Sequence, residues 1–440
     1  MPEETIIAES TPPGVGGFSV LRLSGPGSRS FLARVTKKPK AFFKPRKATL
    51  CPVYTKNKKE IDRCVITFFP APNSYTGEDV IEAACHGNPI IVDALMSELF
   101  DQGARLAEPG EFTKRAFLNG KMDLVQAETV SALISSRTEK AVEILKRAES
   151  GELSTHLFSI RNKIVSSLSS CEYVLDISEQ DLPKDFTYDL LKTTTYITAK
   201  LEKLVSNFKR SVYYFTGARV AITGKPNVGK STLFNRIIGK SRAIVNETPG
   251  TTRDYIEAMT VISGVPVMLI DTAGIRKTND PVELEGVRRS NEEVSNCDLV
   301  VNIYDSVENI DLTKQGISVL NKNDLTVYPK NLLVPGSLLS VSAKTGAGIP
   351  ELKGTIIASL VGDITNTIDL SLTTKRQARS ISLARRATKK ATTLLGEIRP
   401  ELELVAFELR SAVSHLDVVL GTTTTDDLLD AVFSDFCVGK

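Results

Sequence analysis

One glycine-rich segment constrains the fold of this chain more than any other. Residues 224–231 read Gly-Lys-Pro-Asn-Val-Gly-Lys-Ser, after the apolar run Val220–Thr223 and before helix-prone residues that begin at Thr232. A strand, a glycine-rich turn and a helix start in this order predict a phosphate-binding P-loop. The glycines let backbone N–H groups approach the phosphates, and the helix N-terminus favours negative charge. The chain is therefore expected to contain a nucleotide-binding α/β domain.

Short apolar strands alternate with helical stretches after the P-loop, which is typical of a doubly wound α/β domain. The strands are expected at 219–223, 267–270, 299–304, 317–320 and 339–341. Only residues 306–316 lie between Asp305 and the strand at Ile317. A crossover with its helix needs at least about that much chain, so this helix is expected to be short or distorted.

The secondary-structure pattern of the rest of the chain changes twice. The N-terminal part mixes β-prone runs with turns and one helix over Pro89–Phe100, as in an α+β domain. Asp123 and Gln126 form a candidate capping box at which amphipathic helices begin, and helical patterning returns after the α/β domain. The predicted fold is multidomain α+β, with an N-terminal α+β domain at 1–121, a discontinuous helical domain at 122–215 and 368–440, and an α/β domain inserted at 216–367.

Composition narrows the class of protein. The 55 Lys and Arg residues nearly balance 52 Asp and Glu residues, so the formal charge of +3 is that of an ordinary globular protein. The six cysteines include no Cys-x-x-Cys pair, which argues against a zinc ribbon and a disulfide framework. We find no signal peptide and no membrane span. A cytoplasmic protein with neither membrane nor DNA as a partner is expected.

Four further motifs follow the P-loop in the order typical of GTPases. They are Thr251-Thr252, Asp271-Thr-Ala-Gly274, Asn321-Lys-Asn-Asp324 and Ser342-Ala-Lys344. Asp324 indicates the base, because a carboxylate can accept from both N1–H and N2–H₂ of guanine, whereas adenine offers an acceptor at N1. Lys230 is expected on the β- and γ-phosphates, and Ser231 is expected to ligate Mg²⁺. The candidate GTP-binding residues are Asn227, Val228, Gly229, Lys230, Ser231, Thr232, Asn246, Thr248, Thr251, Thr252, Asp271, Thr272, Ala273, Gly274, Asn321, Lys322, Asp324, Ser342, Ala343 and Lys344.

The residues alone leave the hydrolytic step open. Ile275 stands where Ras-like switches carry the glutamine that positions the attacking water. Nearby candidates for that task are Arg276, Asp280, Glu283 and Glu285. Phosphoryl transfer also gains from an arginine finger or an equivalent cation. The side-chain carbonyl of Asn227 suits a bound monovalent cation, and it equally suits a hydrogen bond to the flanking loop.

Motifs along the whole chain resemble the MnmE (TrmE) family of tRNA modification GTPases. They lie at 11–17, 22–25, 72–79, 109–121, 123–128 and 248–254, and at 436–440, which reads Phe-Cys-Val-Gly-Lys. The resemblance implies a Ras-like G domain in which Asn227, Asn246, Thr248 and Thr251 surround K⁺, while Ser231 and Thr252 hold Mg²⁺. It further implies that Glu283 orients the water, with Lys230 and Thr252 also catalytic, when two G domains meet face to face.

The resemblance also implies an N-terminal domain that forms a homodimer and binds 5,10-methylene-tetrahydrofolate, with 5-formyl-tetrahydrofolate as an analogue. Its implied folate contacts are Arg22, Glu82, Lys121 and Lys440. Cys437 belongs to the terminal motif. It either has a role in the site or is a small, buried, apolar side chain with a structural role only. The implied partner is MnmG, which carries FAD and forms a heterotetramer or larger assembly. The implied product is a tRNA with an aminomethyl or carboxymethylaminomethyl group at C5 of its wobble uridine.

Other functions fit parts of the sequence. One alternative is an RNA-binding ribosome-assembly switch of the Era or Der type, and another is a GTP-regulated scaffold that leaves the tRNA chemistry to its partner. The segment Lys375–Lys390 carries seven basic residues and no acid. It could contact tRNA phosphates or form a solvated helix face.

Overall fold

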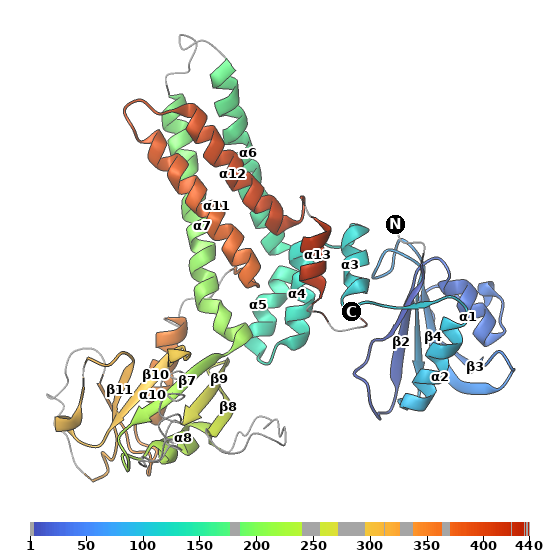
Figure 1. Cartoon of the computed structure of the whole chain (residues 1–440), viewed down its shortest axis with the longest axis horizontal. Coiled ribbons are helices and arrows are strands. Elements are labelled where there is room, and N and C mark those ends of the chain that lie inside the picture. The colour runs from blue at the N-terminus through green and yellow to red at the C-terminus, as the bar shows by residue number, and fades with distance from the viewer. Residues whose placement is uncertain are drawn as a thin grey trace, which may run out of the picture. The chain divides into compact units, whose positions relative to one another are not determined.

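The computed structural model describes residues 4–176, 185–239, 256–271, 295–311, 313–325, 338–362, 370–423, 425–434, 436 and 439. The chain forms two compact units. Figure 1 labels the helices and strands of both. The first comprises residues 1–131, 149–191 and 390–440, and the second comprises residues 132–148 and 192–389. Among the described residues, each unit contains one six-stranded sheet.

The sheet of the first unit has the strand order β3-β4-β5-β2-β1-β6. Its strands are β1 (Ile6–Glu9), β2 (Ser19–Ser24), β3 (Thr49–Tyr54), β4 (Glu60–Phe69), β5 (Val80–Cys85) and β6 (Arg105–Leu106). Neighbouring strands are antiparallel except β1 and β6, which are parallel. Side chains of one face, Leu21 and Ile66 among them, form an apolar core with α1 (Ser28–Thr36) and α2 (Pro89–Phe100). A short 3-10 helix, η1 (Lys40–Phe42), follows α1.

Helices of the first unit begin and pack as their local sequences predict. The backbone N–H of Asp123 donates to Gln126 Oε1, and that of Gln126 donates to Asp123 Oδ1, so the predicted capping box is confirmed. It precedes α4 (Leu124–Ser135), which follows α3 (Glu111–Leu118). The helices α6 (Glu152–Asp176) and α12 (Leu402–Leu420) pack together, joined by an ion pair between Arg161 and Asp417. The last helix, α13 (Asp426–Phe433), packs Phe433 against Leu124 and Phe436.

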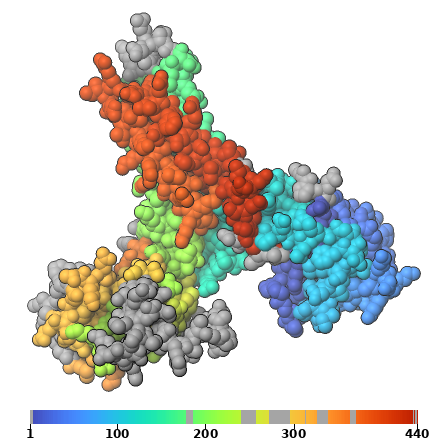
Figure 2. All heavy atoms as spheres, in the orientation of Figure 1, coloured from blue at the N-terminus to red at the C-terminus, as the bar shows by residue number. Residues whose placement is uncertain are grey.

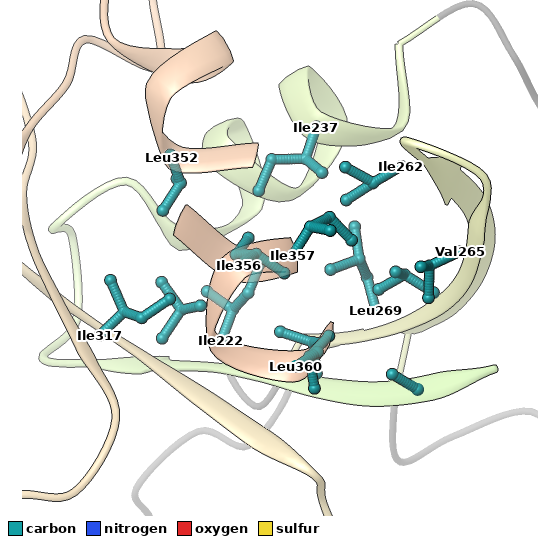
Figure 3. Packing of buried hydrophobic residues seen from close by; sticks show 14 of the residues in the cluster. Ile222, Ile237, Ile262, Val265, Leu269, Ile317, Leu352, Ile356, Ile357 and Leu360 are labelled. Carbon is teal, nitrogen blue, oxygen red and sulfur yellow. The ribbon is translucent and has the colours of Figure 1, made fainter. Parts of the chain in front are cut away.

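The sheet of the second unit has the order β12-β11-β10-β7-β9-β8. The strands are β7 (Ala218–Gly224), β8 (Ile256–Ile262), β9 (Val265–Asp271), β10 (Leu299–Tyr304), β11 (Ile317–Leu320) and β12 (Leu338–Ser340), all parallel to their neighbours except β8. Two helices, α8 (Lys230–Ile238) and α10 (Ile349–Val361), cover one face. Figure 3 shows Ile222 and Leu269 of the sheet gathered with Ile356, Ile357 and Leu360 of α10 in the core.

The chain enters and leaves this α/β domain side by side. It enters from α7 (Phe186–Thr216) and leaves toward α11 (Lys375–Leu395). Near the end of α7, Asn207 Nδ2 donates to the backbone oxygen of Leu370 at 2.7 Å, and the hydroxyls of Ser211 and Ser371 are 2.5 Å apart. Helix α5 (Glu139–Glu149) adds Ala141 and Ile144 to the core of the same unit. The predicted insertion of an α/β domain into a helical domain is therefore confirmed.

The predicted elements agree with the structure where the sequence pattern is strongest. Strands at Leu299–Tyr304 and Ile317–Leu320 and the helix at Pro89–Phe100 have the predicted bounds. In the described residues of the crossover after Asp305, 306–311 and 313–316, the one helical turn is the 3-10 helix η4 (Val307–Asn309), in agreement with the expected short helix. None of the described helices combines the length and apolar character needed to span a membrane.

Candidate functional site

The P-loop connects β7 to α8, and two of its glycines are required by close backbone packing. Gly224 has φ 153°, and a Cβ there would lie 2.5 Å from the backbone oxygen of Ile303 on the neighbouring strand. Gly229 has φ 96°, and its Cβ would collide with the side-chain amide of Asn321. Only glycine allows both the left-handed conformation and the close approach. The loop is thereby pressed against the carboxyl ends of the central strands.

Lys230 lies inside the loop rather than in solvent. Its side chain is buried, and Nζ donates to the backbone oxygens of Gly224 and Lys225, each at 2.8 Å. Burial lowers the pKa of Lys230, and the charge of Asp271 partly restores it. The ammonium is thus held among loop carbonyls at the place where a phosphate-binding lysine is required.

Ser231 and Asp271 bring two oxygen ligands together. Ser231 Oγ donates to Asp271 Oδ2 at 2.8 Å, which joins the first turn of α8 to the end of β9. Asp271 reaches this place because β9 is parallel to β7 and pairs Asp271 with Ile222. A hydroxyl and a carboxylate beside a phosphate loop match the hard oxygen donors that Mg²⁺ prefers. The residues present therefore fit a magnesium ion.

The predicted base-recognition residues surround the end of β11. Asn321 is buried, donates from Nδ2 to the backbone oxygen of Val228 at 2.8 Å, and accepts from the backbone N–H of Ala343 at 3.0 Å. Asp324 is exposed, and its Oδ1 accepts from Ser342 Oγ at 2.6 Å. That hydrogen bond lowers the pKa of Asp324, as does the charge of Lys344. The carboxylate is therefore ionised at neutral pH, the form that accepts from a guanine base.

Two contacts near this site were not predicted from the sequence. Arg236 on α8 donates from Nε to the backbone oxygen of Ala343 at 3.0 Å and also contacts the backbone oxygen of Lys344. Lys225 Nζ donates to Asn309 Oδ1 at 2.7 Å, so the shortened crossover contacts the P-loop. The sequence feature that could have indicated the contact of Arg236 is its position as a basic residue in the last turn of the helix after the P-loop.

Several predicted site residues lie outside the described residues. They are Asn246, Thr248, Thr251, Thr252, Thr272, Ala273, Gly274, Glu283, Cys437 and Lys440. Of the four residues implied for K⁺, the structure describes Asn227, which is exposed in the P-loop at φ 64°. Gly229, Thr232 and Lys322 lie in the same region, and Lys322 Nζ is 3.7 Å from Asp305 Oδ2.

A second group of predicted residues meets on the sheet of the first unit. Arg22 on β2 faces Glu82 on β5 in register, and its Nη2 donates to Glu82 Oε1 at 2.8 Å. The guanidinium of Arg22 lies 5.4 Å from the ring centroid of Tyr75 and 5.7 Å from that of Phe112. The structure thus adds two aromatic rings to a pair of residues that the sequence suggested only by resemblance.

Lys121 and the segment before Lys440 approach this sheet. The aliphatic stem of Lys121 lies beside Gly77, in the turn that carries Tyr75. Ser10 Oγ donates to the backbone oxygen of Gly439 at 3.1 Å, at the end of strand β1. Since Ala8 of β1 pairs with Arg22, Gly439 docks close to the Arg22–Glu82 pair. Three of the four predicted folate residues, together with Gly439 next to the fourth, are therefore gathered around one sheet.

Comparisons with known proteins cover the whole chain. Residues 5–121 match the family described as GTP-binding protein TrmE N-terminus, and residues 124–437 match the MnmE helical domain. The tRNA modification GTPase MnmE of Akkermansia muciniphila is 38% identical, over 100% of this chain and 99% of that protein. The protein of the same name from Aquifex aeolicus is 37% identical, over 99% of this chain and 100% of that protein.

Proposed function

Because the chain belongs to the MnmE family of tRNA modification GTPases and is a GTP hydrolase of tRNA modification, we propose that it acts with the FAD-dependent protein MnmG on C5 of the tRNA wobble uridine. The added group is aminomethyl or carboxymethylaminomethyl, and its carbon comes from a tetrahydrofolate. The observation that carries the proposal is the presence in one chain of a nucleotide loop and a separate Arg22–Glu82 site.

In the proposed GTP cycle, Lys230 leaves the carbonyls of the P-loop and binds the β- and γ-phosphates. The hydroxyls of Ser231 and Thr252 hold Mg²⁺, with Asp271 next to Ser231. When bound, this ion neutralises charge that develops on the phosphates. Asp324 selects guanine, and its hydrogen bond from Ser342 keeps it in the accepting form.

The hydrolytic step is proposed to depend on K⁺ and on Glu283. Asn227, Asn246, Thr248 and Thr251 provide the oxygen ligands of K⁺, and Glu283 orients the attacking water. The exposed position of Asn227 within the P-loop supports its part in this proposal. A cation at this place supplies the charge that an arginine finger supplies in other GTPases.

The N-terminal site is proposed to bind 5,10-methylene-tetrahydrofolate, or 5-formyl-tetrahydrofolate as its analogue. The carboxylate of Glu82 suits the amino and N3–H donors of a pterin, whereas Arg22, Lys121 and Lys440 suit the carboxylates of the glutamate tail. The aromatic rings of Tyr75 and Phe112 beside Arg22 support a site for a flat heterocycle. Cys437 belongs to the terminal segment that contains Lys440, and no role is assigned to it.

We further propose a homodimer through the N-terminal domain. Strand β3 is an edge of its sheet, and Leu50 and Val65 are paired across β3 and β4 with 65% and 43% of their surfaces exposed. An edge strand with exposed apolar side chains is available to pair with a second copy, which supports the proposal.

The proposed domains are residues 1–121, residues 122–215 together with 368–440, and residues 216–367.

Reconstitution tests the proposed reaction directly. Purified protein is incubated with MnmG, GTP, methylene-tetrahydrofolate, an amine donor and unmodified tRNA, and the nucleosides are analysed by mass spectrometry. We expect a modified wobble uridine that disappears when GTP, the folate or either protein is omitted. A Glu82→Gln variant should lose the modification and retain GTP hydrolysis. Unmodified uridine in the complete mixture would contradict the proposal.

A further inference from the structure

The basic residues of α11 fall into two groups in the structure. Arg385 Nη1 donates to Oε1 and Oε2 of Glu202 on α7, at 2.7 and 2.6 Å, and Lys390 Nζ lies 3.2 Å from Glu408 on α12. Arg376 and Lys389 also interact within the chain. These four residues are therefore engaged by other groups of the chain, and Arg385 and Lys390 tie α11 to α7 and α12.

The other three basic residues, Lys375, Arg379 and Arg386, form what we term the α11 stripe. All three are exposed, and none makes an ion pair within the part of the chain that the structure describes. At about 100° per residue, positions separated by four and eleven residues project within about 40° of one another. With a rise of about 1.5 Å per residue, the stripe is about 16 Å long.

The surroundings of the α11 stripe indicate a polyanion rather than a protein. Every exposed residue of α11 between 375 and 390 is basic, and the apolar residues Ile381, Ala384 and Ala387 are buried. Protein interfaces centre on apolar and aromatic side chains, and none of the exposed residues of α11 between 375 and 390 is apolar or aromatic. Figure 2 shows atoms of the helices after residue 370, coloured orange to red, on the face that it draws.

We propose that the α11 stripe binds the phosphate backbone of the substrate tRNA. The proposal rests on the function proposed above, which supplies tRNA as the substrate. Long basic side chains with no neighbouring acid neutralise phosphates and release counterions, so the contribution is electrostatic and independent of base sequence. The stripe and the P-loop belong to the same compact unit of the chain. The stripe therefore positions tRNA without reading its sequence.

A triple variant and a charge-matched control test the α11 stripe. The first carries Lys375→Ala, Arg379→Ala and Arg386→Ala. The second carries Lys56→Ala, Lys58→Ala and Lys59→Ala, three exposed positions at the turn between β3 and β4. Both lose the same charge. Binding of a labelled tRNA transcript by the full-length proteins is measured by fluorescence anisotropy over a series of KCl concentrations, and GTP turnover without tRNA is measured in parallel.

For the stripe variant we expect tRNA affinity to fall at least about tenfold near 0.1 M salt. We also expect the slope of log K against log salt to shrink by about 2 to 3, because each lost phosphate contact removes about 0.7 to 0.9. The control should bind within about twofold of wild type, and basal GTP turnover should be unchanged in both, since neither set touches the P-loop.

Three results would overturn the proposal, and they are distinguishable. An unchanged slope in the stripe variant removes the stripe from tRNA binding. Equal losses in both variants show a general effect of net charge. If the stripe variant binds tRNA normally but, unlike the wild type, no longer co-elutes with MnmG in gel filtration, the face is a protein interface. A wild-type protein that binds no tRNA instead contradicts the proposed function itself, and the stripe with it.

Discussion

Asn321 and Val228 are joined by a 2.8 Å hydrogen bond from the buried side-chain amide to a backbone oxygen of the P-loop. The same amide accepts from the backbone N–H of Ala343 through Oδ1. One side chain thus connects the phosphate loop to the two loops that carry the predicted base-recognition residues. The geometry of the whole nucleotide site depends on this amide, because a buried backbone group without a partner is costly.

Replacing Asn321 should therefore weaken the domain and its nucleotide binding together. Asn321→Ala leaves the oxygen of Val228 and the N–H of Ala343 without partners, at a cost of about 1–3 kcal/mol each. We expect a lower unfolding temperature for the α/β domain and weaker GDP binding, measured by thermal unfolding with and without GDP. Asn323→Ala, two residues away, is the control and should change neither. Unaltered GDP affinity in Asn321→Ala would show that the P-loop holds its shape without this amide.

Asp324 should determine the base. In Asp324→Asn the side chain presents one acceptor and one N–H₂ donor, which no longer match the two donors of guanine but match the N1–H and 2-oxo group of xanthine. Two hydrogen bonds to a charged group at about 1.5–3 kcal/mol each predict a loss of GTP affinity of at least about a hundredfold. Competition between fluorescent GTP and xanthosine triphosphate measures the exchange of preference. Equal preference for GTP in both proteins would exclude Asp324 from base recognition.

GTP turnover should depend on the identity of the monovalent cation. At matched ionic strength we expect turnover at least about tenfold faster in KCl than in NaCl, because a cation in the place of an arginine finger contributes a large part of the rate. Asn227→Ala should abolish this difference. Asn235→Ala, an exposed asparagine on α8, is the matched control and should retain it. Equal rates in both salts for the wild type would contradict the proposed K⁺ site.

The ion pair between α6 and α12 should make the free energy of unfolding of the first unit depend on pH in the acidic range. Burial raises the pKa of Asp417, but hydrogen bonds from Arg161 and Thr422 lower it more, so the net pKa is below the usual value. A carboxyl with a lowered pKa contributes stability that is complete above the usual range near pH 4 and is lost as pH falls through the folded-state pKa.

Asp417→Asn should thus reduce the free energy of unfolding by about 1–3 kcal/mol at pH 7 and by progressively less below about pH 4. Urea unfolding monitored by circular dichroism at several pH values gives this difference. Glu403→Gln, an exposed acid on the same helix, serves as the control and should be nearly neutral at each pH. A difference independent of pH would mean that the pair does not couple folding to protonation.

The sequence by itself determined the order of the elements and the place of the P-loop between β7 and α8. The P-loop, the strands at Leu299–Tyr304 and Ile317–Leu320 and the capping box at Asp123 are all specified by residues adjacent in the chain. Local periodicity, glycine placement and capping require no knowledge of distant contacts. The prediction that Asp324 recognises the base likewise rests on its own chemistry and its place after a strand.

Only the tertiary structure decided which distant side chains meet. Sheet register brings Arg22 to Glu82, and parallel pairing brings Asp271 to Ser231. Helix packing decides that Arg385 is bound by Glu202 while Arg379, on the same helix, remains exposed. These contacts join residues far apart in the chain, and their geometry follows from the register and packing of whole elements. Local patterns do not carry that information, because the same residues would give the same pattern in another register.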